Sequence, residues 1–290
     1  MVDLDIRPSS IAGQWYESDP GALARSVDEY LDLADLPELN GEVLGVIAPH
    51  AGHRYSGAVA GHAFAAIRGR SPEIVVVVSP VHPPKWPMPA SYYKPILTTA
   101  HQGYATPLGD VPVDTELIRE LDSVLEAELK LELSPVSRDP EHSLEIELPF
   151  LQRALTNTWK LLPIMVHLVE PQLSMALGVV LARIIRDRKY LLVASTDLSH
   201  FYDQRTAEIL DAAMLKEIEA FSPEGAFETE RKGKGFACGL GALTTVLWAG
   251  RELGANQVKL LKHATSGDVI GDYSSVVGYG AAAIIKARQS

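Results

Sequence analysis

The sequence predicts an α/β fold: a single domain with a central, mostly parallel or mixed sheet flanked by helices. Short apolar runs rich in β-branched residues alternate with longer segments of helical periodicity. This alternation is typical of strands joined by crossover helices. No repeat of fixed period and no Ser/Gly-rich or Pro-rich linker divides the chain, so we expect one domain over residues 1–290.

The strands and helices are expected in the following order. Apolar runs predict strands near 43–48, 74–79, 161–167, 190–195, 258–264 and 275–285. Helical spacing of apolar residues predicts helices near 20–34, 56–68, 114–127, 142–155, 172–187, 203–219 and 238–253. Asp19, before Pro20, and Ser56 are expected N-caps, and Pro149 should kink the helix at 142–155 or displace its start. Segment 92–114, with its Gly-containing turn, predicts a hairpin.

Composition narrows the class of protein. The chain has 290 residues, of which 47% are hydrophobic and 22% charged, as in an ordinary soluble globular protein. No apolar run reaches the roughly 20 residues of a membrane span, and MVDLDIRPSS is unlike a secretory signal, so a cytoplasmic location is expected. A net charge of −11 argues against nucleic-acid binding. The single cysteine, Cys238, cannot form an internal disulfide and fits a reducing compartment.

Polar side chains follow three of the predicted strands. His50 comes after VLGVIAP, His82 after IVVVVSPV, and Asp197 and His200 after LLVAST. In open α/β sheets, ligands bind outside the carboxyl ends of the strands. If the strands before His50 and His82 are neighbours, their ends lie about 4.8 Å apart, and the two imidazoles can share a metal ion.

Cys238 is a candidate third ligand. It opens the segment CGLGALTTVLWAG, a predicted helix, so its thiol would lie near a helix N-terminus, where the thiolate is favoured. Two imidazoles and a thiolate suit iron, zinc or copper better than magnesium or calcium. His142, Asp197 and His200 would then orient the ligands or transfer protons.

Each of these residues also has a structural interpretation. Asp197 could cap the helix near Asp203 or accept hydrogen bonds from loop amides, and Cys238 could be a small core residue. The remaining histidines are expected to be structural or solvated polar residues: His53, His62, His101, His167 and His263.

A series of motifs resembles the Memo family, in the same order and over nearly the whole chain. The motifs are IAGQWYESDP, VIAPHAGHRYSGAVAGHAF, ATPLGDVPVD, EHSLEIELPFLQ, ASTDLSHFYD, FACGLGAL and ATSGDVIGDYSSVVGYGAA. The resemblance implies a fold similar to that of class III extradiol ring-cleavage dioxygenases. It implies metal ligation by His50, His82 and Cys238, with His142, Asp197 and His200 lining the same pocket. Non-haem iron (Fe²⁺) is the cofactor it favours, with copper or zinc as alternatives.

The resemblance also implies partners, and this chain differs from the Memo pattern at a few positions. Prokaryotic relatives are associated with a radical-SAM protein and a third small protein, and a eukaryotic branch has been treated as a signalling adaptor. Memo sequences usually have an aromatic residue at the place of His53, and commonly Gly-Pro where this chain has Ser79 and Pro80. The dioxygenases use a carboxylate ligand where the Memo pattern offers Cys238, so ring cleavage is not carried over with the fold.

Three functions follow as hypotheses. The first is a metal-dependent, dioxygenase-like redox enzyme acting on a small molecule. The second is a non-enzymatic module or adaptor that binds a peptide or protein in the same cleft. The third makes Cys238 a nucleophile activated by His200.

Overall fold

A mixed sheet forms the centre of the computed structural model, which describes residues 5–84, 86–137, 139–167 and 170–288. Its strands are β2 (Gly41–Ala48), β3 (Ile74–Pro80), β4 (Ile96–Thr99), β7 (Leu133–Val136), β8 (Lys160–Val166), β9 (Tyr190–Ser195), β10 (His200–Tyr202), β11 (Gln257–Thr265) and β12 (Val276–Ala287). Within the described residues the order is β10-β12-β2-β9-β3-β8-β4-β7, with β11 also paired to β12. Strands β2, β9, β3 and β8 are parallel, while β12 and β4 flank them in the antiparallel direction.

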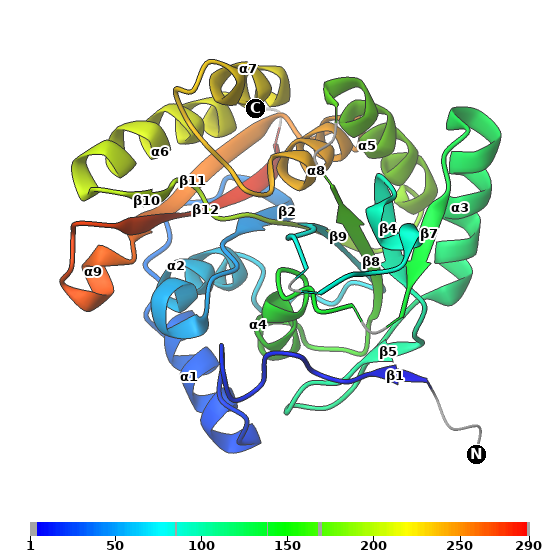
Figure 1. Cartoon of the computed structure of the whole chain (residues 1–290), viewed down its shortest axis with the longest axis horizontal. Helices are drawn as coiled ribbons and strands as arrows, with labels where there is room; N and C mark the ends of the chain where they lie inside the picture. The colour runs from blue at the N-terminus through cyan, green and yellow to red at the C-terminus, as the bar shows by residue number, and fades with distance from the viewer. Residues whose placement is uncertain (1–4, 85, 138, 168–169, 289–290) are drawn as a thin grey trace.

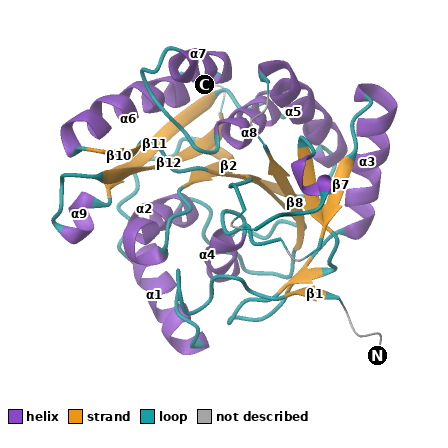
Figure 2. Ribbon diagram, viewed as in Figure 1, coloured by secondary structure: helices purple, strands orange, loops and turns teal. Residues whose placement is uncertain are grey.

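Helices cover both faces of this sheet, as Figures 1 and 2 show. On one face lie α1 (Pro20–Asp32), α2 (His53–Ala65) and α4 (Leu148–Ala154). On the other lie α3 (Thr115–Leu129), α5 (Pro171–Ile185), α6 (Gln204–Glu219), α7 (Pro223–Arg231) and α8 (Leu240–Glu252). Alternation along β3 serves both layers, since Val76 and Val78 face one core and Val75 and Val77 the other. The predicted α/β fold is confirmed.

Smaller elements complete the chain. They are β1 (Ile6–Arg7), β5 (Gly103–Tyr104) and β6 (Val111–Pro112), the short 3₁₀ helices η1 (Ala90–Tyr93) and η2 (Glu145–Glu147), and α9 (Gly267–Ile270). Strands β1, β5 and β6 form a separate three-stranded sheet among the described residues. This small sheet ties the N-terminal segment to the middle of the chain, because Ile6 and Arg7 pair with Gly103 and Tyr104.

Local chemistry explains where several helices begin. Asp19 caps α1 as predicted, accepting a hydrogen bond from the Ala22 amide at 2.7 Å, with Pro20 in the first turn. In α3, Leu117, Leu121 and Leu125 recur at helical spacing, and all three are buried. The amphipathic pattern that predicted these helices is therefore the pattern by which they pack.

Two local predictions are wrong, and the displaced helix start expected at Pro149 is confirmed. Helix α2 starts at His53 with Gly52 as its N-cap, because the Ser56 hydroxyl donates to the Ala51 carbonyl instead of capping. Residues 142–144 are not helical: Pro149 lies in the first turn of α4, so the start of that helix is displaced as the proline allows. The hairpin over 92–114 does not form as predicted, since β4 pairs with β7 and β8, and only β5 and β6 pair with each other.

Candidate metal centre

The rings of His50 and His82 lie close together although the strands that precede them, β2 and β3, are not paired. β9 lies between β2 and β3, so the condition that these two strands are neighbours is not met. Both histidines follow the carboxyl ends of their strands, and their ring centroids are 5.2 Å apart. The His50 ring reaches the end of β9, where its Nδ1 lies 2.9 Å from the Ser195 hydroxyl. The middle strand therefore supports the pair instead of separating it.

His142 completes a cluster of three imidazoles. It lies in the loop between β7 and η2, and its ring centroid is 4.5 Å from that of His82 and 5.6 Å from that of His50. One ring nitrogen from each histidine lies within 4.8 Å of the others, a spacing at which the three can hold a metal ion. Trp15 packs against His142 at 4.1 Å between ring centroids and limits its movement.

Glu141 orients His82. Its carboxylate oxygens accept the His82 ring Nδ1–H at 2.9 Å and the His82 backbone amide at 2.6 Å. The backbone amides of His142 and Ser143 also donate to it, each at 2.9 Å. A carboxylate that only accepts fixes the proton on His82 Nδ1, which leaves Nε2 as the free ligand atom. Sequence analysis missed Glu141, although it precedes His142 in a motif already singled out.

Ser195 orients His50 by the same logic. The Ser195 hydroxyl donates to the Ser143 carbonyl at 2.7 Å, so its single hydrogen is already used. It must therefore accept from Nδ1–H of His50, and the Nε2 lone pair of His50 remains available. The His50 amide is held as well, donating to Asp197 Oδ1 at 2.8 Å.

The protonation of the cluster favours metal binding. Burial, followed by the neighbouring His142 and His82, lowers the pKa of His50 well below its ordinary value. Burial also lowers the pKa of His142 to about 4, although the Glu141 carboxylate opposes this. For His82, burial acts downward too, but the hydrogen bond to Glu141 outweighs it and raises the pKa. At neutral pH, His50 and His142 are the neutral imidazoles that metal ions require.

Cys238 touches the cluster through His50. Its Sγ lies 3.1 Å from His50 Nε2 and accepts the Asp197 amide at 3.3 Å. Gly239 permits this approach, since a Cβ there would stand 2.4 Å from the Ser195 carbonyl oxygen. Burial, then the Asp197 carboxyl, raises the pKa of Cys238 well above its ordinary value. The metal-free chain thus carries a thiol, and the expected thiolate at the start of α8 is not favoured without an ion.

Asp197 and His200 lie beside the cluster. Asp197 accepts from the His50 amide and does not cap α6, whose N-cap is Asp203. Burial raises the pKa of Asp197 to about 7, against the hydrogen bond from His50. His200 Nδ1 lies 2.8 Å from the Leu198 carbonyl, which accepts its proton and leaves His200 Nε2 unprotonated. Burial lowers the pKa of His200 as well.

A cavity opens over these groups. It has a volume of about 530 Å³, and its lining includes Trp15, His50, His82, His142, Asp197, His200, Phe201 and Tyr279. The structure therefore gathers five of the six predicted site residues at one cavity, with Cys238 directly behind His50. A second cavity, of about 450 Å³, shares Trp15, His82 and His142 and continues toward Trp86.

Arg7 holds the loop that carries Glu141 and His142. Its guanidinium is 1% exposed and forms ion pairs with Asp139 at 3.0 Å and Glu145 at 2.5 Å. It also donates to the Glu141 carbonyl at 2.8 Å. Sequence analysis missed Arg7, because an isolated arginine near the N-terminus has the same pattern as a solvated one.

The other histidines bond elsewhere. His53 is buried, lies near Tyr16 and Phe150, and donates its Nε2–H to the Ile146 carbonyl at 3.2 Å, so its ring points into the core. Partners of the rest are Ala58 for His62, Asp5 for His101, Tyr92 for His167 and Asp211 for His263. None of them belongs to the imidazole cluster in the described part of the chain.

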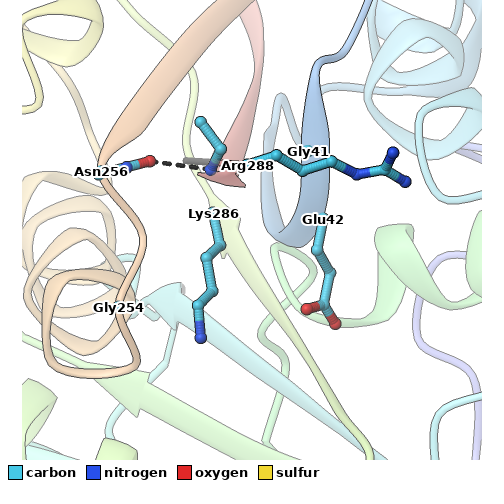
Figure 3. Close-up of a pocket in the computed structure, with 7 residues that line it drawn as sticks. Gly41, Glu42, Gly254, Asn256, Lys286 and Arg288 are labelled. Atoms are coloured by element: carbon cyan, nitrogen blue, oxygen red, sulfur yellow. Dashed lines mark hydrogen bonds between the residues drawn. The ribbon is translucent and has the colours of Figure 1, made fainter. Parts of the chain in front are cut away.

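A further hollow lies at the opposite edge of the sheet, near the start of β2 (Figure 3). Gly41, Glu42, Gly254, Lys286 and Arg288 surround it, and Asn256 Oδ1 accepts the Ala287 amide at 2.8 Å. It contains no histidine or cysteine, which separates it from the metal centre.

Comparison with known proteins identifies the family of this chain. A family profile described as "Memo-like protein" matches residues 7–283. The chain belongs to the Memo family. A "MEMO1 family protein" of Nitrosopumilus maritimus (strain SCM1) is 33% identical over 280 residues, covering 95% of this chain and 98% of that protein. The "MEMO1 family protein MK0963" of Methanopyrus kandleri is 32% identical over 289 residues, covering 95% of this chain and 97% of that protein.

A crystal structure of the uncharacterized protein JW3007 from Escherichia coli K12 aligns with a TM-score of 0.43 and 14% sequence identity, over 82% of this chain and 99% of that chain. Among the described residues of the Memo-family chain, no helix is both long and apolar enough to cross a membrane.

Proposed function

We propose that this Memo-family chain is a metal-dependent oxidoreductase of the non-haem iron type, with its ion held at the His50–His82 pair. The observation that carries the proposal is the convergence of three imidazole nitrogens within 4.8 Å beside a free thiol. The resemblance assigns the third position to Cys238. Imidazole and thiolate suit iron, copper and zinc.

The donor set fits such an ion. Ser195 and Glu141 hold the protons of His50 and His82 on Nδ1, so both Nε2 atoms remain available as ligand atoms. Three protein ligands would leave positions for a small substrate, and the cavity of about 530 Å³ supplies the room. A bound redox-active ion would supply electron transfer and polarisation of a ligand oxygen or nitrogen.

The surrounding residues would move protons. His200 Nε2 is unprotonated and lines the cavity, so it can accept a proton from a substrate. The Asp197 carboxyl, with its pKa raised by burial to about 7, can release or take up a proton near neutral pH. His142, held between Trp15 and His82, orients a ligand or completes the ion's coordination.

Metal analysis tests the proposal. We expect about one iron or copper ion per chain in protein purified without oxygen, and loss of that metal in both His50→Ala and His82→Ala. His62→Gln is the matched control, since His62 is a buried histidine that bonds within its own helix. Metal-free wild-type protein with an intact fold would sink the proposal.

A second function is favoured by the aromatic side chains at the cavity mouths. Phe201 is 76% exposed and lines the cavity over the cluster, and Trp86 is 53% exposed at the neighbouring one. Exposed apolar groups around a cleft are typical of peptide or protein contacts. A binding module requires no ion, so an unchanged complex with a captured partner in His50→Ala and His82→Ala would favour it over the oxidoreductase.

Cys238 as a nucleophile activated by His200 has less support. The thiol's hydrogen-bond partners are His50 and Asp197, and His200 is bonded to Leu198. With its pKa raised by burial, the thiol lacks the activation that acyl transfer requires.

A further inference from the structure

The metal centre contains one shared pair of ligands and two candidates for the third. His50 and His82 are common to both sets. His142 approaches from the loop before η2, and Cys238 from the segment before α8. The resemblance to Memo proteins points to Cys238, whereas the ring nitrogens that lie closest together in the structure include His142.

The geometry does not place all four donors around one point. Ligand atoms of one ion lie about 2.0–2.3 Å from it, and hence within roughly 4.5 Å of one another. The three imidazole nitrogens come near this limit, at up to 4.8 Å apart. The Cys238 sulfur is 3.1 Å from His50 Nε2 but forms no mutually close group with His50 and His82 among the described residues, so the His50–His82–Cys238 set requires a side chain to move when the ion binds. An ion centred among the three imidazoles is therefore not coordinated by the Cys238 sulfur.

Each candidate third ligand has other contacts in the protein when it does not bind the ion. The Cys238 sulfur accepts the Asp197 amide at 3.3 Å and lies 3.7 Å from the Asp197 carbonyl, to which its hydrogen can turn. The His142 ring packs on Trp15, with Nδ1 3.4 Å from Glu141 Oε1.

We propose that the site has two alternative ligand sets, His50–His82–His142 and His50–His82–Cys238, and that the softness of the metal ion selects between them. This inference rests on the proposed metal site. Imidazole suits nickel, while soft thiolate selects ions such as Cu⁺; Cd²⁺ is a soft probe of the same kind. Iron is bound in proteins by both donor types and can use either set.

Two probe ions, Ni²⁺ and Cd²⁺, test the inference by competition titration on the wild-type protein and three variants. We expect His142→Phe, which retains a ring against Trp15, to lower the affinity for Ni²⁺ about tenfold or more. The affinity for Cd²⁺ should fall much less. Cys238→Ala should lower the affinity for Cd²⁺ about tenfold or more and the affinity for Ni²⁺ much less. His62→Gln, outside the cluster, should change neither affinity.

Absorption spectra of the wild-type protein provide a readout that does not depend on how the variants fold. Cd²⁺ should produce a sulfur-to-metal charge-transfer band, and Ni²⁺ should bind without one. A sulfur band with both ions, or equal loss of both ions in the same variant, would overturn the two-set inference while leaving the metal site intact. Failure of either ion to bind the wild-type protein at the His50–His82 pair would overturn the inference, and failure of both would overturn the proposed function too.

Discussion

Glu141 binds His82 at two points, accepting the ring Nδ1–H at 2.9 Å and the backbone amide at 2.6 Å. The same carboxylate accepts the amides of His142 and Ser143. One buried acidic side chain thus sets both the position of the 141–143 backbone and the tautomer of a proposed ligand.

Glu141→Gln tests this arrangement. A carboxamide has a single acceptor oxygen and directs an NH₂ group at donors, so we expect metal affinity to fall roughly 10- to 100-fold. Competition titration with Zn²⁺ measures the change. Glu132→Gln, an exposed partner of Lys94, is the control and should leave the affinity unaltered. Equal affinities in Glu141→Gln and wild type would show that this carboxylate does not support the site.

Arg7→Met should destabilise the fold strongly. It leaves the buried carboxylates of Asp139 and Glu145 without their counter-charge, a change that costs about 3–5 kcal/mol. Urea unfolding of the metal-free protein measures it. Arg183→Met is the control: Arg183 and Glu128 form an exposed pair, so we expect a loss of less than about 1 kcal/mol. Similar losses in the two variants would contradict the role of Arg7.

Glu147 predicts a pH dependence of stability. This glutamate is 1% exposed, and within the described part of the chain neither of its carboxyl oxygens has a hydrogen-bond partner. Burial raises its pKa well above the ordinary 4.5; the nearby Ser195 hydroxyl opposes the shift and the Asp197 carboxyl adds to it. The folded chain therefore keeps a proton that the unfolded chain releases above pH 4.5. The stability contribution of this group is lost as pH rises from there toward the folded-state pKa.

Glu147→Gln removes that titration. Relative to wild type, the variant should gain stability as pH rises, by up to about 1.4 kcal/mol per pH unit until the folded-state pKa is reached. Unfolding free energies of both metal-free proteins between about pH 5 and 8 measure the difference. A difference that stays constant over this interval would show that Glu147 is not held protonated.

Gly239→Ala should separate the thiol from His50. The added Cβ would stand 2.4 Å from the Ser195 carbonyl oxygen and 2.8 Å from Thr196 Cβ, so the segment must move away from β9. We expect a stability loss of about 1–3 kcal/mol and a weaker sulfur-to-cadmium band. Gly21→Ala in α1 is the control, because its Cβ would meet only the ends of the Arg25 and Asp19 side chains. A full-strength band in Gly239→Ala would contradict this account.

The parts of the fold that sequence analysis predicted have strong local patterns. The apolar runs of β3 and β9 and the leucine spacing of α3 are set by residues close in sequence, and each element formed near its predicted place. The pairing of β2 and β3 with β9 depends on contacts between distant segments, so the sequence left open whether β2 and β3 are neighbours. Strands as short as β1, β5 and β6 have too few residues to show a period.

The candidate site was predicted in part for the same reason. His50, His82, Asp197 and His200 were found because they follow recognisable strands, and Cys238 because it opens a predicted helix; the family motifs include all six residues, His142 among them. Arg7, Glu141 and Ser195 were missed, since nothing local distinguishes a buried ion pair 138 residues apart, such as Arg7–Glu145, from surface charges. Long-range burial gives these side chains their role, and sequence pattern does not record it.

Anomalous diffraction from crystals of the Ni²⁺-loaded protein tests the central claim most directly. The account predicts one strong peak within about 2.0–2.3 Å of the Nε2 atoms of both His50 and His82. A peak at any other place, such as the hollow around Lys286 and Glu42 at the opposite edge of the sheet, with none at the His50–His82 pair, would contradict it.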